Sequence, residues 1–217
     1  MIMGEMKISP SILDADFKNL QQEIDSIKGA DRIHLDIMDG QYVPNLSFGP
    51  PVLADIDYGV ETEAHLMVNN PENFFEMFQR LGVLGITFHI ENTGRERALG
   101  LLKQLKSSKI RAGISIDGYT SPDFLSDEIL DIADQVLVMS VKAGFGGQSF
   151  MPESIEKIKN LRARGFSGEI EVDGGVTLDN VDALSEAGAD IVVVGSFLMR
   201  RSVEERNKII RKFQEID

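Results

Sequence analysis

The stretch Ile33–Gly40 reads Ile-His-Leu-Asp-Ile-Met-Asp-Gly and decides both the fold and the chemistry. Its apolar and polar residues alternate as they do in a half-buried β-strand, so His34 and Asp36 share one face. An imidazole beside a carboxylate is a ligand pair that suits zinc, iron or manganese. The stretch therefore predicts a strand whose end presents two metal ligands.

Two other strand ends offer ligands of the same kind. His65 lies on the same face as Met67 near the end of one apolar run, and a later run, Glu169–Gly175, reaches Asp173 at its end. Together these ends predict one divalent metal, Zn, Fe(II), Mn or Co, in a site whose ligand types suit several ions. The four expected ligands are His34, Asp36, His65 and Asp173.

Two neighbouring polar residues are not expected to be ligands or catalysts. His89 has no adjacent ligand motif, so a supporting or structural role is expected for it. Glu171 shares a face with Asp173, and in the interior of a protein it would need a partner or a proton.

Strand-length apolar runs recur along the whole chain, with helical patterns between them. This alternation is typical of β-α units around a parallel sheet. Eight strands are expected near 7–9, 32–37, 63–67, 85–90, 111–116, 135–139, 168–173 and 190–195. Helices are expected near 16–27, 71–81, 95–106, 152–164, 178–187 and 203–213, with short ones after the second and fifth strands. The pattern predicts an α/β fold, a single (β/α)8 TIM barrel over residues 1–217, with an open doubly wound sheet as the alternative.

Composition narrows the class of protein. The 217 residues contain no cysteine, which excludes disulfides and thiolate chemistry and is compatible with the cytoplasm. The formal net charge of −13 argues against nucleic-acid binding, because phosphate backbones are bound chiefly by lysine and arginine. No secretion signal or membrane-length apolar run is present in the sequence, so a soluble cytoplasmic protein without a membrane partner is expected.

Asp36 and Asp173 are the expected catalytic residues. They belong to the second and seventh strands, on roughly opposite sides of an eight-stranded barrel, and could flank one substrate carbon. One carboxylate could then remove a proton from one face while the other returns a proton to the opposite face, which inverts the carbon. The enediolate formed beside a ketone needs its negative charge stabilised, and a divalent cation does this directly.

Three glycine-bearing turns after the last three strands are expected to bind a phosphate. Glycine lets backbone amides approach an anion closely, and barrels often bind phosphate in these late loops. The expected residues are Gly144, Gly146, Gly147, Gly174, Gly175, Gly195 and Ser196. Met38, Met67 and Met139 each end a strand, where they either pack plainly or form an apolar collar that excludes water from the site.

These motifs closely resemble, in the same order along the chain, those of the ribulose-phosphate 3-epimerase family. The matching stretches are 8–13, 34–40, 43–45, 48–50, 65–67, 139–141, 144–150 and 171–176. The resemblance implies a TIM-barrel isomerase of carbohydrate metabolism that interconverts D-ribulose 5-phosphate and D-xylulose 5-phosphate in the pentose phosphate pathway. It also implies that Ser9 contacts the substrate, that the three methionines line the enediolate, and that the chain assembles as a homo-oligomer.

Two loops depart from the family pattern. The chain has Lys142 and Ala143 where the family usually has Asn-Pro, and Asp117 and Gly118 where Asn-Pro is again common. Both loops are expected to border the sugar, so Lys142 either contributes to substrate choice or is simply solvated. An allulose-6-phosphate 3-epimerase, which shares the catalytic residues, is therefore an alternative. A non-catalytic phosphosugar-binding barrel and a hydrolytic metalloenzyme are further alternatives, although the intact ligand set argues against the former.

Overall fold

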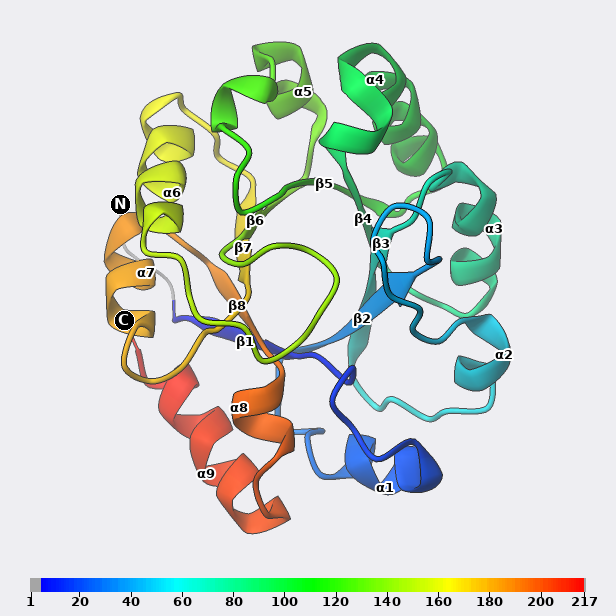
Figure 1. The fold of residues 1–217 in the computed structure, drawn as a ribbon, viewed down its shortest axis with the longest axis vertical. Coiled ribbons are helices and arrows are strands. Elements are labelled where there is room, and N and C mark those ends of the chain that lie inside the picture. The colour runs from blue at the N-terminus through cyan, green and yellow to red at the C-terminus, as the bar shows by residue number, and fades with distance from the viewer. Residues whose placement is uncertain (1–4, 217) are drawn as a thin grey trace.

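A ring of eight parallel strands surrounded by helices forms the architecture of the protein (Figure 1). The computed structural model describes residues 5–216. Hydrogen-bonded neighbours around the ring follow the order β1-β8-β7-β6-β5-β4-β3-β2. The first and second strands meet through a parallel bridge between Ser11 and His34, and Asp31 N–H donates to the carbonyl of Ile8 at 3.1 Å. The ring is thus a TIM barrel, and the open-sheet alternative is wrong.

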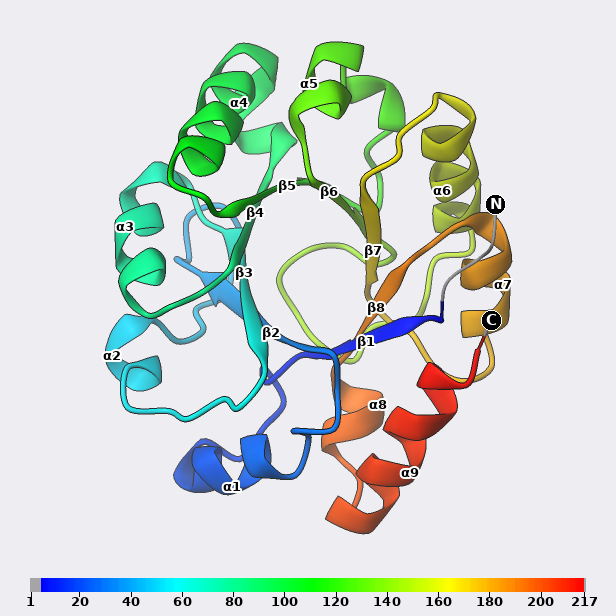
Figure 2. The same ribbon diagram turned by 180° about the vertical axis from the view of Figure 1, so that it is seen from behind.

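The strands lie where the alternation of apolar residues predicts them. They are β1 (Lys7–Pro10), β2 (Arg32–Met38), β3 (Glu61–Met67), β4 (Gly85–His89), β5 (Arg111–Ile116), β6 (Gln135–Met139), β7 (Glu169–Asp173) and β8 (Ile191–Val194). The helices are α1 (Leu20–Asp25), α2 (Pro50–Leu53), α3 (Glu72–Arg80), α4 (Ile90–Ser107), α5 (Asp127–Ile132), α6 (Glu153–Ala163), α7 (Val181–Ala187), α8 (Ser196–Met199) and α9 (Val203–Gln214). Figure 2 shows the same ring from behind, with the helices again outside it.

Three helical segments differ from the prediction. The helix expected near 16–27 divides into a 3-10 turn (Phe17–Asn19), capped by the side chain of Asp16, and the short α1. Helix α4 begins five residues early, but Gly94 interrupts it with a left-handed φ of 67°. The short α8 was not expected. The first turn of α4 is therefore a separate structural feature, and it contains Glu91.

Strand β2 shows how the two faces of the ring are used. Ile33, Leu35 and Ile37 join the hydrophobic core between the ring and the helices, whereas Arg32, His34 and Asp36 alternate with them and point inside the ring. All seven residues of the strand are buried. The barrel interior is consequently polar along much of its length, with the apolar core outside it.

The carboxyl ends of the strands open on one face, where the loop between β6 and α6 curls across the centre of the ring (Figure 1). Barrel enzymes carry their active sites on this face. No helix among residues 5–216 is long and apolar enough to cross a membrane.

Candidate active site

Four predicted ligands meet inside the barrel near its carboxyl end. Asp36 Oδ1 lies 3.1 Å from His65 Nδ1 and 3.4 Å from His34 Nε2. Asp173 Oδ2 lies 3.7 Å from the same His65 nitrogen. One ligand atom from each of the four residues lies within 4.8 Å of all the others. The structure thus brings together the whole predicted set, which comes from β2, β3 and β7.

The chemistry of these side chains fits a divalent cation. Both histidines are fully buried, and Nε2 of His34 points into the cluster, where it has an ion-pair contact of 3.4 Å with Asp36 Oδ1 but no hydrogen-bond partner among the described residues. A buried imidazole nitrogen without a partner is unfavourable unless something else occupies its lone pair. Two imidazoles with two carboxylates are a donor set that several divalent metals accept.

The two carboxylates of the cluster differ in their electrostatic surroundings. Burial works to raise the pKa of Asp36, but His34 and His65 outweigh it and hold that pKa well below its usual range. The Ser11 hydroxyl also donates to Asp36 Oδ2 at 2.5 Å. Burial, followed by the negative charge of Asp36, raises the pKa of Asp173 to about 7. Without a bound cation, the surroundings therefore keep Asp36 ionised and make Asp173 the more easily protonated of the two carboxylates.

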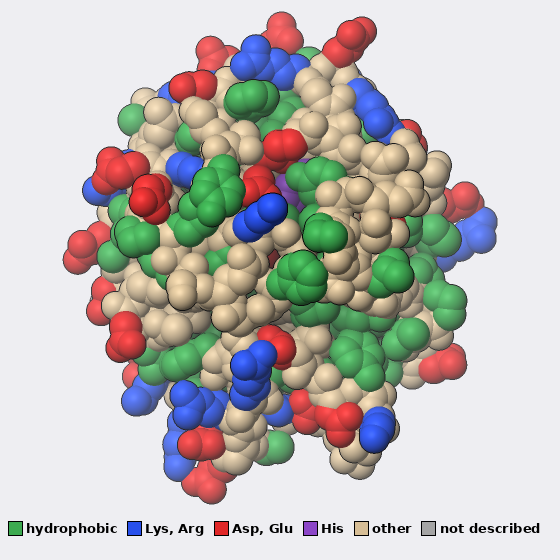
Figure 3. All heavy atoms as spheres, in the orientation of Figure 1, with side chains coloured by type: hydrophobic (Ala, Val, Ile, Leu, Met, Phe, Trp, Pro, Cys, Tyr) green, Lys and Arg blue, Asp and Glu red, His purple; other side chains and the backbone are tan. Residues whose placement is uncertain are grey.

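A cavity of about 460 Å³ opens above the cluster. Figure 3 shows this face of the molecule, which is hollowed near its centre among acidic, basic and hydrophobic side chains. Asp36, Asp173 and all three predicted methionines line the cavity. The glycine-turn residues that line it are Gly144, Gly146, Gly147, Gly174, Gly175, Gly195 and Ser196. Every predicted cavity residue except Ser9 therefore reaches the same space, while His34 and His65 lie beneath it.

Glycine is required in the turn after β7 for steric reasons. Gly175 has a φ of 63°, and a Cβ atom there would come within 2.6 Å of the Phe150 backbone nitrogen. At Gly174 a Cβ atom would meet the Val141 side chain at 2.5 Å. The β7 turn can approach the β6 loop this closely only because both residues lack side chains.

Ser11, which directly follows β1, reaches the cavity, whereas Ser9 within β1 does not. The hydroxyl of Ser9 lies deeper in the barrel, 3.4 Å from Glu63 Oε1, and Ser9 does not line the cavity. Ser11 lines the cavity and contacts Asp36. Sequence reasoning missed this role, although Ser11 lies two residues after Ser9 and a strand places such residues on one face. Arg200 was also missed; it lines the cavity and forms a 3.0 Å ion pair with Asp14.

A hydrogen bond joins the two loops that depart from the family pattern. Ala143 is buried and its N–H donates to Asp117 Oδ2 at 3.1 Å, a bond that a proline at this position could not make. The Lys142 side chain is exposed and does not line the cavity. Ala143 and Asp117 are thus coupled, whereas Lys142 extends from the loop surface.

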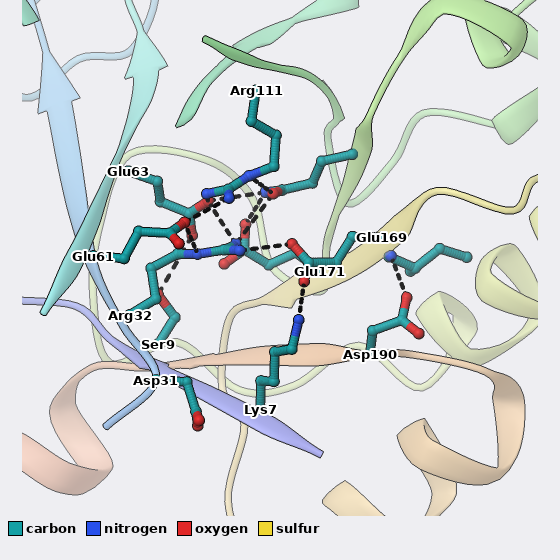
Figure 4. Close-up of polar contacts among 12 residues, drawn as sticks. Lys7, Ser9, Asp31, Arg32, Glu61, Glu63, Arg111, Glu169, Glu171 and Asp190 are labelled. Atoms are coloured by element: carbon teal, nitrogen blue, oxygen red, sulfur yellow. Dashed lines mark hydrogen bonds and ion pairs between the residues drawn. The ribbon is translucent and has the colours of Figure 1, made fainter. Parts of the chain in front are cut away.

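Below the cluster, the barrel is closed by a network of buried charges (Figure 4). The Arg32 guanidinium bonds Glu61, Glu63 and Glu169 at 2.8–3.1 Å. Glu63 Oε1 lies 3.1 Å from His34 Nδ1, so the network reaches the metal-ligand cluster from below. Burial opposes ionisation of Glu63, but Arg32 outweighs it and holds the pKa of Glu63 well below normal.

Glu171 points into the barrel interior and has a hydrogen-bond partner on one of its two carboxyl oxygens. It is fully buried, and the Gln135 amide donates to its Oε2 at 2.5 Å. Burial and then the charge of Glu63 raise the pKa of Glu171 well above its usual value. Glu171 thus has the interior position and the partner that were expected for it.

A closed barrel with carboxylates and histidines at the carboxyl ends of its strands has the arrangement of a TIM-barrel enzyme. Residues 7–199 match the model of the ribulose-phosphate 3 epimerase family, and the chain belongs to that family. It is an isomerase of the epimerase type, and no observation favours the non-catalytic alternative.

Individual relatives agree with this assignment. A protein of Oryza sativa named "Ribulose-phosphate 3-epimerase, cytoplasmic isoform" is 42% identical over 88% of this chain and 86% of its own length. The Helicobacter pylori ribulose-phosphate 3-epimerase is 39% identical over 97% of this chain and 98% of its own. A solved 3-hexulose-6-phosphate synthase superimposes with a TM-score of 0.73 over 98% of this chain and all of its own, at 13% identity, which shows the shared fold alone.

Proposed function

We propose that the protein interconverts D-ribulose 5-phosphate and D-xylulose 5-phosphate by inverting carbon 3, with Asp36 and Asp173 as the two acid/base groups. The observation that carries this proposal is the meeting of carboxylates from β2 and β7 in one cavity, beside two histidines, in a chain of this family. The relatives compared are named for ribulose phosphate, and no observation favours the allulose-6-phosphate alternative.

The phosphate would be held by backbone amides of the late loops. Gly146, Gly147, Gly175, Gly195 and Ser196 belong to three different loops and line one side of the cavity. Their amides suit an anion even in a chain of net charge −13, because local donors outweigh a distant field. Holding the phosphate there orients the sugar carbons toward the two carboxylates.

The proton transfers follow from the positions of Asp36 and Asp173. One carboxylate removes the proton from carbon 3, and the electron pair of the broken C–H bond enters the enediolate. The other carboxyl group then returns a proton to the opposite face of carbon 3. The base thereby gains one proton and the acid loses one, and exchange with water restores both. Ser11, bonded to Asp36, holds this carboxylate in place. Met38, Met67 and Met139 supply an apolar lining that keeps water from the enediolate.

His34, Asp36, His65 and Asp173 would hold the metal. A divalent cation held by them supplies positive charge that stabilises the enediolate oxygens. Zn, Fe(II), Mn and Co all suit these ligands, and metal supply contributes to which is used. Both carboxylates are assigned to proton transfer, which leaves no free base to activate water for hydrolysis.

A coupled assay for xylulose 5-phosphate tests the proposal. Metal-replete protein supplied with ribulose 5-phosphate should form xylulose 5-phosphate, with a higher kcat/KM than it shows for allulose 6-phosphate. Binding of ribulose 5-phosphate without turnover would overturn the assignment. A higher kcat/KM for allulose 6-phosphate would make that sugar phosphate the substrate instead.

The compartment and the assembly remain proposals as well. The rice relative is named a cytoplasmic isoform, and the cysteine-free sequence is compatible with the same location. We also propose a homo-oligomer, which light scattering coupled to size exclusion would test.

A further inference from the structure

His89 is the third histidine of the barrel, and the proposed reaction assigns it no role. It ends β4 and is buried, with its ring stacked on that of His65 at a centroid distance of 5.0 Å and an interplanar angle of 24°. The Nε2 atoms of the two rings lie 2.8 Å apart. Two nitrogens at this distance share one proton, so the tautomer of one ring dictates that of the other.

The cluster fixes the direction of this hydrogen bond. Nδ1 of His65 faces Asp36 and Asp173, so it is the nitrogen that would ligate a metal. The proton of a neutral ligating His65 is then on Nε2, which donates to Nε2 of His89. His89 must accept there, and its own proton is consequently on Nδ1.

The carboxylate of Glu91 completes the chain. Its Oε2 lies 3.3 Å from His89 Nδ1, where it can accept the remaining proton. The Asp117 backbone N–H donates to Oε1 at 2.7 Å and holds the carboxylate in place. Burial raises the pKa of Glu91, but the hydrogen bond from His89 and further donors outweigh it and lower this pKa to about 2. Glu91 is therefore an anion that can only accept hydrogen bonds.

We propose that His89 and Glu91 are positioning residues for the metal ligand His65. Glu91 fixes the tautomer of His89, and His89 fixes that of His65, so that Nδ1 of His65 presents its lone pair to the cluster. This inference rests on the proposed metal site. A carboxylate behind a ligating histidine also increases the basicity of that ligand, and here the effect passes through a second imidazole.

The second ligating histidine has a different support. Nδ1 of His34 lies directly against Glu63 Oε1 at 3.1 Å, with no intervening ring. Glu63 is held by Arg32 inside the barrel, whereas Glu91 is held by a loop amide near the mouth. The two ligands are thus fixed independently, and changes at His89 should affect His65 alone.

Zinc affinity provides the first test. Chelator-stripped protein would be titrated with zinc against a competing fluorescent chelator, for wild type, His89→Phe, His89→Gln and Glu91→Gln. His89→Phe should raise the zinc dissociation constant ~10–100-fold. His89→Gln should recover most of this loss, because its amide oxygen can accept the hydrogen bond from His65 Nε2. The zinc dissociation constant of Glu91→Gln should lie between those of wild type and His89→Phe.

Asn92→Ala is the matched control. Asn92 follows Glu91 in the same helical turn and bonds the carbonyls of Val68 and Asn69, away from His89. Asn92→Ala should leave the zinc dissociation constant within a factor of about two of the wild-type value. An unchanged dissociation constant in both His89→Phe and Glu91→Gln would overturn the positioning role, as would equal losses in His89→Phe and His89→Gln. If His89→Phe fails to fold, the zinc dissociation constants of Glu91→Gln and Asn92→Ala are compared instead, and equal values would overturn the positioning role.

Nitrogen NMR of the wild-type protein tests the tautomers without any mutation. The chain has three histidines, so their ring nitrogens can be assigned individually. Zinc-loaded protein should show His65 protonated at Nε2 and His89 at Nδ1, and a proton on Nε2 of His89 would overturn the inference. Failure of wild-type protein to bind zinc would instead overturn the metal site itself.

Discussion

The two ends of the barrel interior use the same kinds of side chain in opposite ways. At the amino end, Arg32 lies among carboxylates that it neutralises, and the groups bond one another (Figure 4). At the carboxyl end, two histidines and two carboxylates converge, and Nε2 of His34 has no hydrogen-bond partner within residues 5–216. The first arrangement pairs the Arg32 cation with its own carboxylates, although Arg111 Nη2 and Glu171 Oε1 there lack hydrogen-bond partners in the described part of the chain. The second brings four possible ligand atoms within 4.8 Å of one another. Polar residues inside this barrel are therefore structural at one end and functional at the other.

His34 connects the two ends. Its Nδ1 contacts Glu63 of the lower network, while its Nε2 belongs to the upper cluster. The lower network thus fixes one functional ligand in addition to closing the barrel. Changes in the upper cluster, in the lower network and in the two loops should differ in the size of their effects.

The largest effect should come from removing a carboxylate of the upper cluster. Asp36→Asn and Asp173→Asn should each lower kcat/KM for ribulose 5-phosphate by ~10²–10⁴-fold, because each loses an acid/base group. Steady-state kinetics measures this. Asp182→Asn, an exposed change of the same chemistry on α7, is the control. Near-normal turnover in either cluster variant would contradict the two-carboxylate assignment.

The next largest effect should be on stability, at the other end. Arg32→Met leaves buried carboxylates without their cation and should lower the free energy of unfolding by ~3–5 kcal/mol, measured by urea denaturation. Lys7→Met removes a half-exposed cation from the same Glu169 and should cost only ~0–1 kcal/mol. Equal losses in the two variants would show that the lower network is not what holds this end together.

Metal binding should stabilise the fold through the upper cluster alone. Adding zinc to stripped protein at about 100 times its dissociation constant should raise the free energy of unfolding by ~2.7 kcal/mol, seen as a higher melting temperature. His65→Ala should abolish most of this gain, whereas Lys7→Met should keep it. A zinc-dependent gain that survives in His65→Ala would place the metal elsewhere.

The smallest effects should come from the two loops. Ala143→Pro removes the donor to Asp117 and should cost ~0.5–1.5 kcal/mol of stability. Lys142→Asn should leave both stability and KM unchanged, because this side chain is exposed and outside the cavity lining. A clear rise in KM for Lys142→Asn would show that this lysine reaches the substrate during turnover.

The sequence predicts what depends on local periodicity. Alternation locates β2 and places His34 and Asp36 on one face, and the late glycine turns identify the cavity walls. The sequence does not predict which side chains pair when the two partners come from strands far apart in the chain. Arg32 and Glu169 are 137 residues apart, and only closure of the ring shows that they are paired. His89 was not connected to His65 for the same reason: neighbouring strands must be in register before the two rings can stack.

Isotope exchange at carbon 3 tests the central claim most directly. Wild-type, metal-replete protein would be given ribulose 5-phosphate in D2O, and the xylulose 5-phosphate formed would be analysed by proton NMR. Two carboxylates that exchange their protons with water should deliver deuterium to carbon 3 of every product molecule in the first turnovers. Product that retains the original carbon 3 hydrogen would contradict the account.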